Sequence, residues 1–589
     1  MWTLDCETDP FHNCDQADCA KCHGGGRVPK PFAWGVYNGD DYESFQEAEE
    51  VVEHFSARKD LVYAHNGGKF DYHYLRDYIN SDEPVMLING RMSRFRIGEC
   101  EFRDSLNIFP NTRLADFGVK NEIDYALMEP AARTDPNVAE QIGKYLKQDC
   151  VGLHEVVTRY RSEYGTKLTQ ASASMKRWEE MSGLDAPRQT HEQYKRYKPY
   201  YYGGRVQCFE SGCSATQFQV ADINSAYPYA MLRDHMFSPQ GMRQKHLPPE
   251  PDIYKCLIKL DCTSRGAFPW RDPDTHELFF PDDEAGHRNR MRTYTITGWE
   301  FMAALELDLV KNIVIRECHV FSQTVNFKDY IDHFYQLRMD ATAAGDKAGR
   351  IFGKYFMNSL YGKFGANCEH YAEYVIASVD SIASWRAKGY LRYKDWGERT
   401  LMERKPTSEE LSDVEGKWRF YNVATAASVT GFVRAHLLRA IHRSSGVIYC
   451  DTDSIAARDV AALDFGDRLG QWKNEGGFDR YAIAGKKLYA FHVAGKSIAY
   501  DPKNEKDPTW KIASKGVNFN RLEAGPELVS RIANGEVITF HPESPCYSVT
   551  RQEPMFISRD VKCTAKDMSQ APDVGPSQEK ELGPERVRF

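Results

Sequence analysis

The sequence predicts an α/β protein built from several domains. Its 589 residues, 42% of them hydrophobic, are enough to bury several separate cores. The stretch Val447–Ala457 (VIYCDTDSIAA) has the pattern of two apolar strands joined by an acidic turn. A second stretch, Arg350–Phe364, has polar residues at the spacing of one helical face: Arg350, Lys354, Asn358 and Tyr361. Strand-like and helical segments therefore occur together in this chain.

The composition narrows the class of protein. A net charge of -8 and a pI near 6.2 give no overall signature of a nucleic-acid binder, but they allow a basic groove balanced by acidic surfaces elsewhere. The N-terminus, MWTLDCETDP, lacks the features of a signal peptide, and no run of about 18 apolar residues could span a membrane. Fifteen cysteines without a secretory signal indicate a reducing compartment. We therefore expect a cytoplasmic protein with no membrane partner.

The first 165 residues carry a group of acids on separate segments. The strand-like TLDCETD places Asp5 and Glu7 on one side, because residues two apart in a strand face the same way. The other candidates are Asn66 and Asp71 in YAHNGGKFDYHYL, and Tyr145 and Asp149 one helical turn apart in YLKQD. Each alone is ordinarily a surface group, so they form a site only if the fold brings them together.

A cysteine-rich loop over residues 11–27 interrupts this region. Its sequence, FHNCDQADCAKCHGGGR, offers a C-x4-C-x2-C-H spacing that could form a tetrahedral zinc site from Cys14, Cys19, Cys22 and His23, with His12 as the other histidine. The alternative is a flexible reduced loop with incidental thiols, because a second CxxC pair is missing. A zinc ion here would be structural.

Three further acids occur in the central and C-terminal parts of the chain. Asp451 and Asp453 lie one residue apart at the predicted turn, where they repel each other. They could belong to an ordinary polar turn, or they could bind a divalent cation, which takes oxygen ligands. Asp222, in VADINSAYPYAM, ends another strand-like segment. Together the three acids suit two cations that activate an attacking oxygen and stabilise a leaving oxygen in phosphoryl transfer.

The predicted helical face in Arg350–Phe364 suggests the substrate. Lys354 could meet phosphate oxygens while an aromatic ring lies under a base, an arrangement that suits a nucleoside triphosphate. A solvated basic face is the usual alternative. Arg338, in a second helical stretch over Tyr330–Ala343, could reach the same phosphates.

Three of these segments resemble motifs of one enzyme family. DINSAYP, KYFMNSLYG and YCDTDS resemble motifs A, B and C of family B DNA polymerases, in the same order. YYGG at Tyr201–Gly204 resembles the family's YxGG element, and KLY at Lys487–Tyr489 its KxY motif. TGFVR at Thr430–Arg434 resembles a TxxGR element, with Val433 where the family often has Gly. The likeness is greatest to the protein-primed subgroup, particularly its tectivirus-type members, which carry an extra insertion between motifs A and B.

The resemblance implies an RNase H-like 3′–5′ exonuclease domain followed by a right-hand polymerase of palm, fingers and thumb. The implied boundaries are 1–165 for the exonuclease domain, 166–220 for the linker, 221–262 and 422–517 for the palm, 263–327 for a terminal-protein-region-like insertion, 328–365 for the fingers, 366–421 for a second insertion, and 518–589 for the thumb and tail.

The resemblance also implies roles at the polymerase site. Asp222 and Asp453 would bind two Mg²⁺ (or Mn²⁺) ions, with the carbonyl of Ile223 as a further ligand and Asp451 in support. Tyr227 would exclude a ribose 2′-hydroxyl. The expected nucleotide contacts are Ile223, Tyr227, Arg338, Lys354, Asn358 and Tyr361, and the expected DNA contacts are Tyr201, Gly203, Gly204, Thr430, Arg434, Lys487 and Tyr489.

For the N-terminal region the resemblance implies a proofreading site. Two Mg²⁺ ions would be held by Asp5, Glu7, Asp71 and Asp149, and Tyr145 would orient the attacking water. Asn66, together with Ser105, Leu106 and Phe109 of an (S/T)Lxxh element, would bind single-stranded DNA. The family's catalytic lysine has no clear counterpart, and Arg113 is the substitute that the sequence suggests.

The implied function is template-directed DNA synthesis with proofreading, replicating a linear viral or plasmid genome. A hydroxyl of a terminal protein would serve as the first primer, so the partners would be template and primer DNA, dNTPs and that protein, and the enzyme would be a monomer or a heterodimer with it. One alternative is a family B polymerase that uses nucleic-acid primers. Another is an inactive DNA-binding homologue, which the retained, mutually repelling acids argue against.

The insertion at 263–327 has two interpretations. It could be a tolerated surface insertion, because long loops cost little once their ends are anchored. It could instead be a clamp around duplex DNA that also contacts the primer protein, with Arg288, Arg290 and Arg292 meeting phosphate or an acidic surface.

Overall fold

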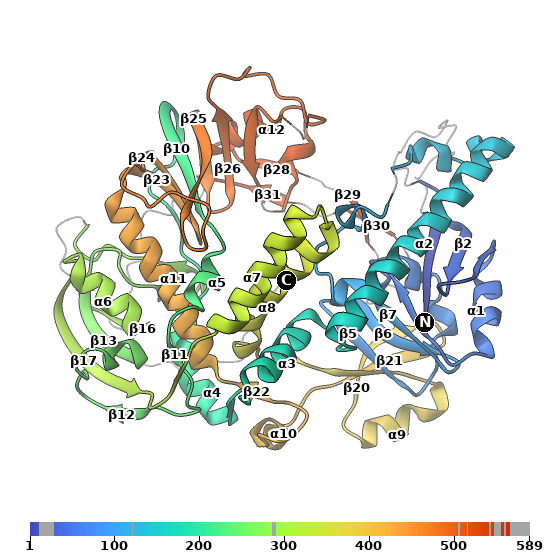
Figure 1. The fold of residues 1–589 in the computed structure, drawn as a ribbon, viewed down its shortest axis with the longest axis horizontal. Helices are drawn as coiled ribbons and strands as arrows, with labels where there is room; N and C mark the ends of the chain where they lie inside the picture. Colours follow the sequence, from blue (N-terminus) through green and yellow to red (C-terminus); the bar gives the residue numbers. More distant parts are fainter. Residues whose placement is uncertain are drawn as a thin grey trace.

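The computed structural model describes residues 1–10, 29–120, 122–285, 290–504, 507–514, 516–540, 543–546, 555–558 and 561–565. The proposed zinc ligands Cys14, Cys19, Cys22 and His23 lie outside these residues, as does Arg288. The N-terminal domain forms one side of the molecule in Figure 1, the palm and the first insertion form the other, and two long helices, α7 and α8, lie between them. No helix in the described part of the chain is long and apolar enough to cross a membrane.

The N-terminal domain contributes seven neighbouring strands to a ten-stranded sheet. Strand β1 (Trp2–Thr8) pairs in parallel with β4 (Leu61–Ala64) and antiparallel with β2 (Pro31–Tyr37). The other strands contributed by this domain are β3 (Tyr42–Phe45), β5 (Pro84–Ile88), β6 (Arg91–Ile97) and β7 (Cys100–Asp104). Helix α2 (Pro136–Tyr164), capped by Asp135 with proline at its first turn, packs against β1 and β2.

The remaining strands of this sheet come from the predicted second insertion. They are β19 (Glu373–Ala377), β20 (Leu391–Trp396) and β21 (Arg399–Arg404), and β19 pairs with β5. Asp82 accepts hydrogen bonds from Ser378 and from the indole of Trp385. Ile376, Trp396 and Leu401 are buried in the same core as the N-terminal strands. The segment predicted as a separate insertion at 366–421 is therefore partly a component of the N-terminal sheet.

The predicted palm contains a seven-stranded antiparallel sheet in the order β27-β26-β25-β10-β24-β23-β9. Its strands are β9 (Val206–Cys208), β10 (Gly212–Ile223), β23 (Ser445–Asp451), β24 (Ser454–Asp459), β25 (Trp472–Gly485), β26 (Leu488–Val493) and β27 (Trp510–Ala513). Helix α11 (Val423–Arg443) is buried along most of its length. The turn between β23 and β24 lies next to the end of β10. The three acids of motifs A and C therefore lie together at one end of these strands.

The segment predicted as the fingers consists of helices α7 (Lys328–Ala343) and α8 (Lys347–Phe364). They pack closely at Gly353, where a Cβ atom would lie only 2.9 Å from the carbonyl oxygen of Phe334. Helix α8 also packs against the N-terminal domain, because the ring of Phe352 stacks on Phe109 with centroids 5.7 Å apart. The fingers and the N-terminal domain therefore share one core.

The first insertion contains a four-stranded sheet in the order β12-β17-β13-β16. Its elements are β12 (Met242–Gln244), β13 (Cys256–Ser264), β16 (Arg292–Thr297), α6 (Gly298–Glu306) and β17 (Val310–Val320). The predicted start of the insertion at residue 263 thus falls inside β13. Arg292 is only 7% exposed and pairs with the buried Asp283 at 2.7 Å, so it does not provide the surface charge expected of a clamp.

The remaining elements connect these parts or form the thumb. The connecting elements are α1 (Ala48–Ser56), α3 (Gln170–Ser182), β8 (Arg188–Gln189), α4 (His191–Tyr197), α5 (Ala226–Ala230), β11 (His235–Met236), β14 (Trp270–Arg271), β15 (Leu278–Phe279), β18 (Thr324–Val325), α9 (Ile382–Ala387), α10 (Ser408–Ser412) and β22 (Phe420–Tyr421). The C-terminal elements are α12 (Gly525–Ala533), β28 (Ile538–Phe540), β29 (Glu543–Cys546), β30 (Met555–Ser558) and β31 (Val561–Cys563).

Candidate active sites

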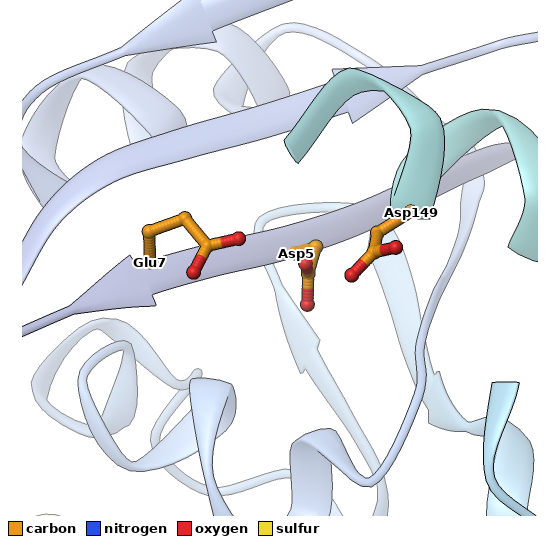
Figure 2. A group of neighbouring side chains, drawn as sticks. All are labelled: Asp5, Glu7 and Asp149. Carbon is orange, nitrogen blue, oxygen red and sulfur yellow. The ribbon is translucent and has the colours of Figure 1, made fainter. Parts of the chain in front are cut away.

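The N-terminal acids converge on one face of β1. Asp5 and Glu7 come from this strand and Asp149 from α2, and Figure 2 shows the three carboxylates beside one another. One oxygen of each lies within 4.8 Å of one oxygen of the other two. Asp71 is 1% exposed, and its Oδ1 accepts a hydrogen bond from the backbone N–H of Cys6 at 3.0 Å. This hydrogen bond ties Asp71 to the strand that carries Asp5 and Glu7.

Burial and neighbouring negative charges make the ionised forms of these acids unfavourable. Burial, followed by the charge of Asp149, raises the pKa of Glu7 to about 8, and burial raises the pKa of Asp71 to about 6. Burial and then the charges of Asp71 and Asp149 raise the pKa of Asp5 well above its usual range. Glu7 Oε1 and Asp149 Oδ1 are buried without a hydrogen-bond partner. Clustered carboxylate oxygens without protein partners fit divalent cations, which would supply the missing positive charge.

Lys120 is a functional candidate that the sequence did not reveal. Its Nζ lies 2.6 Å from Oδ2 of Asp149 and 4.8 Å from the ring centroid of Tyr145. Burial alone would lower the pKa of Lys120, but the charges of Asp149 and Asp5 outweigh it and raise the pKa. Arg113, which the sequence suggested for this position, instead pairs with Asp116, and its side chain is 80% exposed. The structure therefore places Lys120, and not Arg113, beside the carboxylates.

The second acidic site lies at the turn between β23 and β24. Thr452 adopts a left-handed conformation (φ 59°), and the N–H of Asp453 donates to the carbonyl of Asp451 at 2.6 Å. Asp222 stands opposite, at the position on β10 that pairs with Ser454. Burial and then the charge of Asp453 raise the pKa of Asp222 to about 6. Burial and then Asp451 raise the pKa of Asp453.

This second set is looser than the first. Among the described residues, its three carboxylates do not gather within the 4.8 Å spacing of the N-terminal set. Lys487, which has a left-handed backbone, places its Nζ 3.1 Å from Oδ2 of Asp451. Asp451 therefore has a lysine partner, whereas the charge of Asp453 raises the pKa of Asp222 and the charge of Asp451 raises that of Asp453. The all-oxygen donor set still fits hard divalent cations.

Helices α5, α7 and α8 bring aromatic and basic residues close to the end of β10. The rings of Tyr227, on α5, and Tyr361, on α8, stack with centroids 4.4 Å apart and planes 8° apart. Arg338 Nη1 lies 3.4 Å from the hydroxyl of Ser225, close behind Asp222 in the chain. Lys354 is exposed, and Asn358 donates from Nδ2 to its carbonyl at 2.7 Å. Motifs A and B are therefore neighbours in space, as a site for an incoming nucleotide requires.

The expected DNA contacts with accessible surface are distributed along both sites. Tyr489 stacks on Phe491 with centroids 4.2 Å apart. The other members of this group are Asn66 and Leu106 in the N-terminal domain, Tyr201, Gly203 and Gly204 in the YxGG element, and Lys487 beside the acidic turn, all of them partly or fully exposed.

Relatives of known identity share this architecture. Residues 124–406 match the model of the family described as DNA polymerase type B, organellar and viral. Over 588 residues the chain is 32% identical to the DNA-directed DNA polymerase of Enterobacteria phage PRD1, which covers 95% of this chain and 97% of that protein. This chain is a family B DNA polymerase. The predicted polymerase family and fold class are confirmed.

Two further similarities concern shorter segments or the fold. The polymerase is 26% identical over 337 residues to the DNA polymerase of Streptococcus phage Cp-1, covering 52% of this chain and 54% of that one. Its fold matches the structure of phi29 DNA polymerase complexed with primer-template DNA with a TM-score of 0.67 at 18% identity, covering 96% of this chain and 99% of the other. The architecture therefore extends over nearly the whole polymerase.

Four of the residues expected to contact DNA have buried side chains in this structure. Ser105 and Phe109 have no exposed surface, and Thr430 and Arg434 are each 2% exposed. Ser105 is hydrogen-bonded to His65, Phe109 stacks on the fingers, and Arg434 is paired with Glu300. Their side chains support neighbouring elements and have no surface for direct contact with DNA.

Proposed function

We propose that the polymerase adds nucleotides at Asp222, Asp451 and Asp453 and removes them at the N-terminal carboxylates. The observation that carries this proposal is the presence of two separate acidic sets, a largely buried one at β1 and α2 and a half-buried one at the β23–β24 turn, each with carboxyl groups of raised pKa. Two Mg²⁺ or Mn²⁺ ions bound at each set would activate the attacking oxygen and stabilise the leaving oxygen.

At the polymerase site, Asp222 and Asp453 hold the cations, with the carbonyl of Ile223 as a further ligand. Lys354 and Arg338 offset the charge of the triphosphate. Asn358 and Tyr361 line the nascent base pair. Stacking on Tyr361 holds the ring of Tyr227 in place. In the proposed site this ring excludes a ribose 2′-hydroxyl.

The primer terminus is held on the other side of the acidic turn. Lys487 reaches this turn through Asp451, and Tyr489 lies in an aromatic group with Tyr449 and Phe491. Gly204 contacts Thr452 of the same turn, and Tyr201 and Gly203 precede it in the YxGG element. These residues place a primer hydroxyl against the α-phosphate of the nucleotide, and pyrophosphate leaves.

In the N-terminal domain, Asp5, Glu7, Asp71 and Asp149 hold the cations of a 3′–5′ exonuclease. Tyr145 and Lys120 lie against each other at Asp149, where a phenol and an ammonium group can orient a water toward the terminal phosphodiester. Asn66 and Leu106 lie at accessible positions for the unpaired strand.

The first primer is proposed to be a hydroxyl of a terminal protein, so that the enzyme replicates the ends of a linear viral or plasmid genome, in the host cytoplasm. The relationship to the PRD1 polymerase over nearly the full length of both chains supports this proposal. The first insertion, whose sheet lies beside the palm in Figure 1, is a candidate surface for that partner.

Incubation with labelled dNTP, template and candidate terminal protein tests the initiation step. We expect label on the protein before any labelled DNA appears. The control replaces the terminal protein with a DNA primer, and the polymerase variant Asp453→Ala should label neither. Label that appears only on DNA primers would favour the nucleic-acid-primed alternative.

A further inference from the structure

We propose that Glu300, in the first insertion, is a positioning residue for the acidic turn Asp451–Asp453 of the polymerase site. The proposal rests on the function proposed above for this turn. It begins at a buried ion pair between α6 of the insertion and α11 of the palm. Glu300 Oε1 accepts a hydrogen bond from Arg434 Nε at 2.7 Å, and both side chains are 2% exposed.

Arg434 transmits this contact to the loop that precedes β9. Its Nη1 donates to the carbonyl oxygens of Tyr202 at 2.7 Å and Gly203 at 2.8 Å. Both carbonyls belong to the YxGG element. One guanidinium group therefore fixes two successive peptide units, while Glu300 fixes the guanidinium group.

The other side of this loop holds the acidic turn. A Cβ atom on Gly204 would lie 2.5 Å from Thr452 Oγ1, so the loop backbone touches the residue between the two aspartates. The N–H of Thr452 donates to the carbonyl of Arg205 at 2.6 Å, and its hydroxyl donates to Asp451 Oδ1 at 3.0 Å. A continuous series of contacts therefore joins Glu300 to the carboxylates.

Other residues of the insertion hold the same loop. The hydroxyl of Tyr202 is hydrogen-bonded to Thr295 Oγ1 at 2.6 Å. The guanidinium group of Arg205, 3% exposed, lies 4.4 Å from the ring centroid of Phe280. Lys486, next to the lysine that pairs with Asp451, donates to the carbonyl of Leu278 at 2.6 Å. The insertion therefore contacts the surroundings of the acidic turn at several points, a role that a tolerated surface insertion would not have.

Glu300→Gln is the decisive variant. Glu300 Oε2 accepts the N–H of Thr297 in the capping box of α6, and an amide oxygen can keep that bond while the charge opposite Arg434 is lost. Arg434 would remain buried and positively charged without its partner, so the loop that it fixes should loosen.

The same two helices offer a matched control. Glu306 pairs with Arg439 at 2.7 Å, again between α6 and α11, but these side chains are 50% and 23% exposed. Glu306→Gln therefore removes an equivalent charge pair that has no contact with the YxGG loop.

The first readout is hydrogen–deuterium exchange of peptides covering residues 447–457 in the substrate-free, metal-free enzyme. We expect faster exchange in Glu300→Gln, because the Thr452 N–H bond to Arg205 weakens, and no change in Glu306→Gln. The second readout is the Mg²⁺ concentration that gives half-maximal single-nucleotide addition, which we expect to rise severalfold in Glu300→Gln only. The Mg²⁺ dependence of 3′–5′ degradation should stay the same in both variants.

Unchanged exchange at residues 447–457 in a folded Glu300→Gln enzyme would overturn the proposal, as would an equal change in Glu306→Gln. If Glu300→Gln does not fold, Thr295→Val removes the bond to Tyr202, and it should change both readouts in the same direction. An unchanged Thr295→Val enzyme would then overturn the proposal. If the function proposed for this turn is itself wrong, the Asp453→Ala variant will still add nucleotides, which distinguishes that failure from failure of the Glu300 proposal.

Discussion

Lys487 Nζ lies 3.1 Å from the Oδ2 oxygen of Asp451. A residue of the KxY motif thus forms an ion pair with a residue of motif C. In the absence of a cation, this lysine is the positive charge nearest to Asp451, while Asp222 and Asp453 keep raised pKa values from burial and from neighbouring acids. The three acids of this site are therefore not equivalent, and substitutions at Asp222 and Asp453 should have the greatest effect.

Asp222→Ala or Asp453→Ala should abolish nucleotide addition and leave 3′–5′ degradation of single strands intact. The reason is that the two acidic sets lie on separate sheets. Primer extension and degradation of an end-labelled single strand, measured on the same preparation, check this. Loss of both activities in a folded variant would contradict the two-site assignment.

Asp5→Ala combined with Glu7→Ala should remove the degradation and keep primer extension. These two carboxylates contribute two of the three converging oxygens in the N-terminal set. The measurement is the rate of release of a 3′-terminal nucleotide in a preparation free of contaminating nucleases. An unchanged rate would show that the N-terminal ligands are wrongly assigned.

Lys120→Ala should slow degradation by roughly 10²–10³-fold, the usual effect of removing one oriented charged donor from an active site. Its Nζ pairs with Asp149 at 2.6 Å. Arg113→Ala is the matched control, since that side chain pairs with Asp116 on the surface, and it should degrade DNA at the normal rate. The opposite ranking of the two variants would restore Arg113 as the catalytic cation.

The raised pKa of Glu7 makes stability depend on pH. In the metal-free folded enzyme the pKa of Glu7 is about 8, whereas the ordinary value for a glutamate is 4.5. Between the two pKa values, 4.5 and about 8, the folded state therefore binds more protons than the unfolded state. The free energy of unfolding falls as the pH rises through this range. Mg²⁺ removes this penalty by neutralising the carboxylates.

Mg²⁺ should accordingly raise the Tm more at about pH 9 than at about pH 6. Thermal unfolding with and without Mg²⁺ at the two pH values measures this effect. In Glu7→Gln the pH dependence of the Mg²⁺ effect should shrink. An equal Mg²⁺ effect at both pH values in the unmodified enzyme would show that Glu7 does not hold its proton against the metal.

Tyr227→Val should weaken the discrimination against ribonucleotides by roughly 10–100-fold, since the ring no longer occupies the space of the 2′-hydroxyl. Tyr227 stacks on Tyr361 with planes 8° apart, which holds the ring in place. The measurement is the ratio of kcat/KM for a dNTP to that for the matching rNTP. Tyr361→Phe keeps the stacking ring and should preserve the ratio.

Local patterns in the sequence were enough to place several of the N-terminal acids near one another. Asp5 and Glu7 follow from strand alternation, and Tyr145 and Asp149 from one helical turn, because those spacings are local properties of the chain. Lys120 could not be found in this way. It comes from a loop that reaches Asp149 only through tertiary packing, and no spacing rule marks such a residue.

Motif resemblance was less reliable for exposure than for position. Arg434 lies where the TxxGR-type element predicts, but Glu300 buries it, and a partner 134 residues away is not visible in a five-residue motif. Phe109 is buried for the same kind of reason, because it stacks on a fingers helix far away in the sequence. The domain borders at 263 and 366 were placed from motif spacing, which does not show which sheet a strand joins.

The strands between residues 373 and 404 have a consequence for protein synthesis. Strand β19 pairs with β5, and the side chains of Ile376, Trp396 and Leu401 fill the N-terminal core. The N-terminal domain therefore cannot complete its sheet until the ribosome has translated residue 404. Until then β5 is an open edge, and open edges invite pairing with other chains. A fragment ending at residue 165 should therefore aggregate when expressed alone, and supplying residues 366–421 as a separate polypeptide should rescue it. The nascent polymerase is thus committed to a late folding step that joins its beginning to its middle.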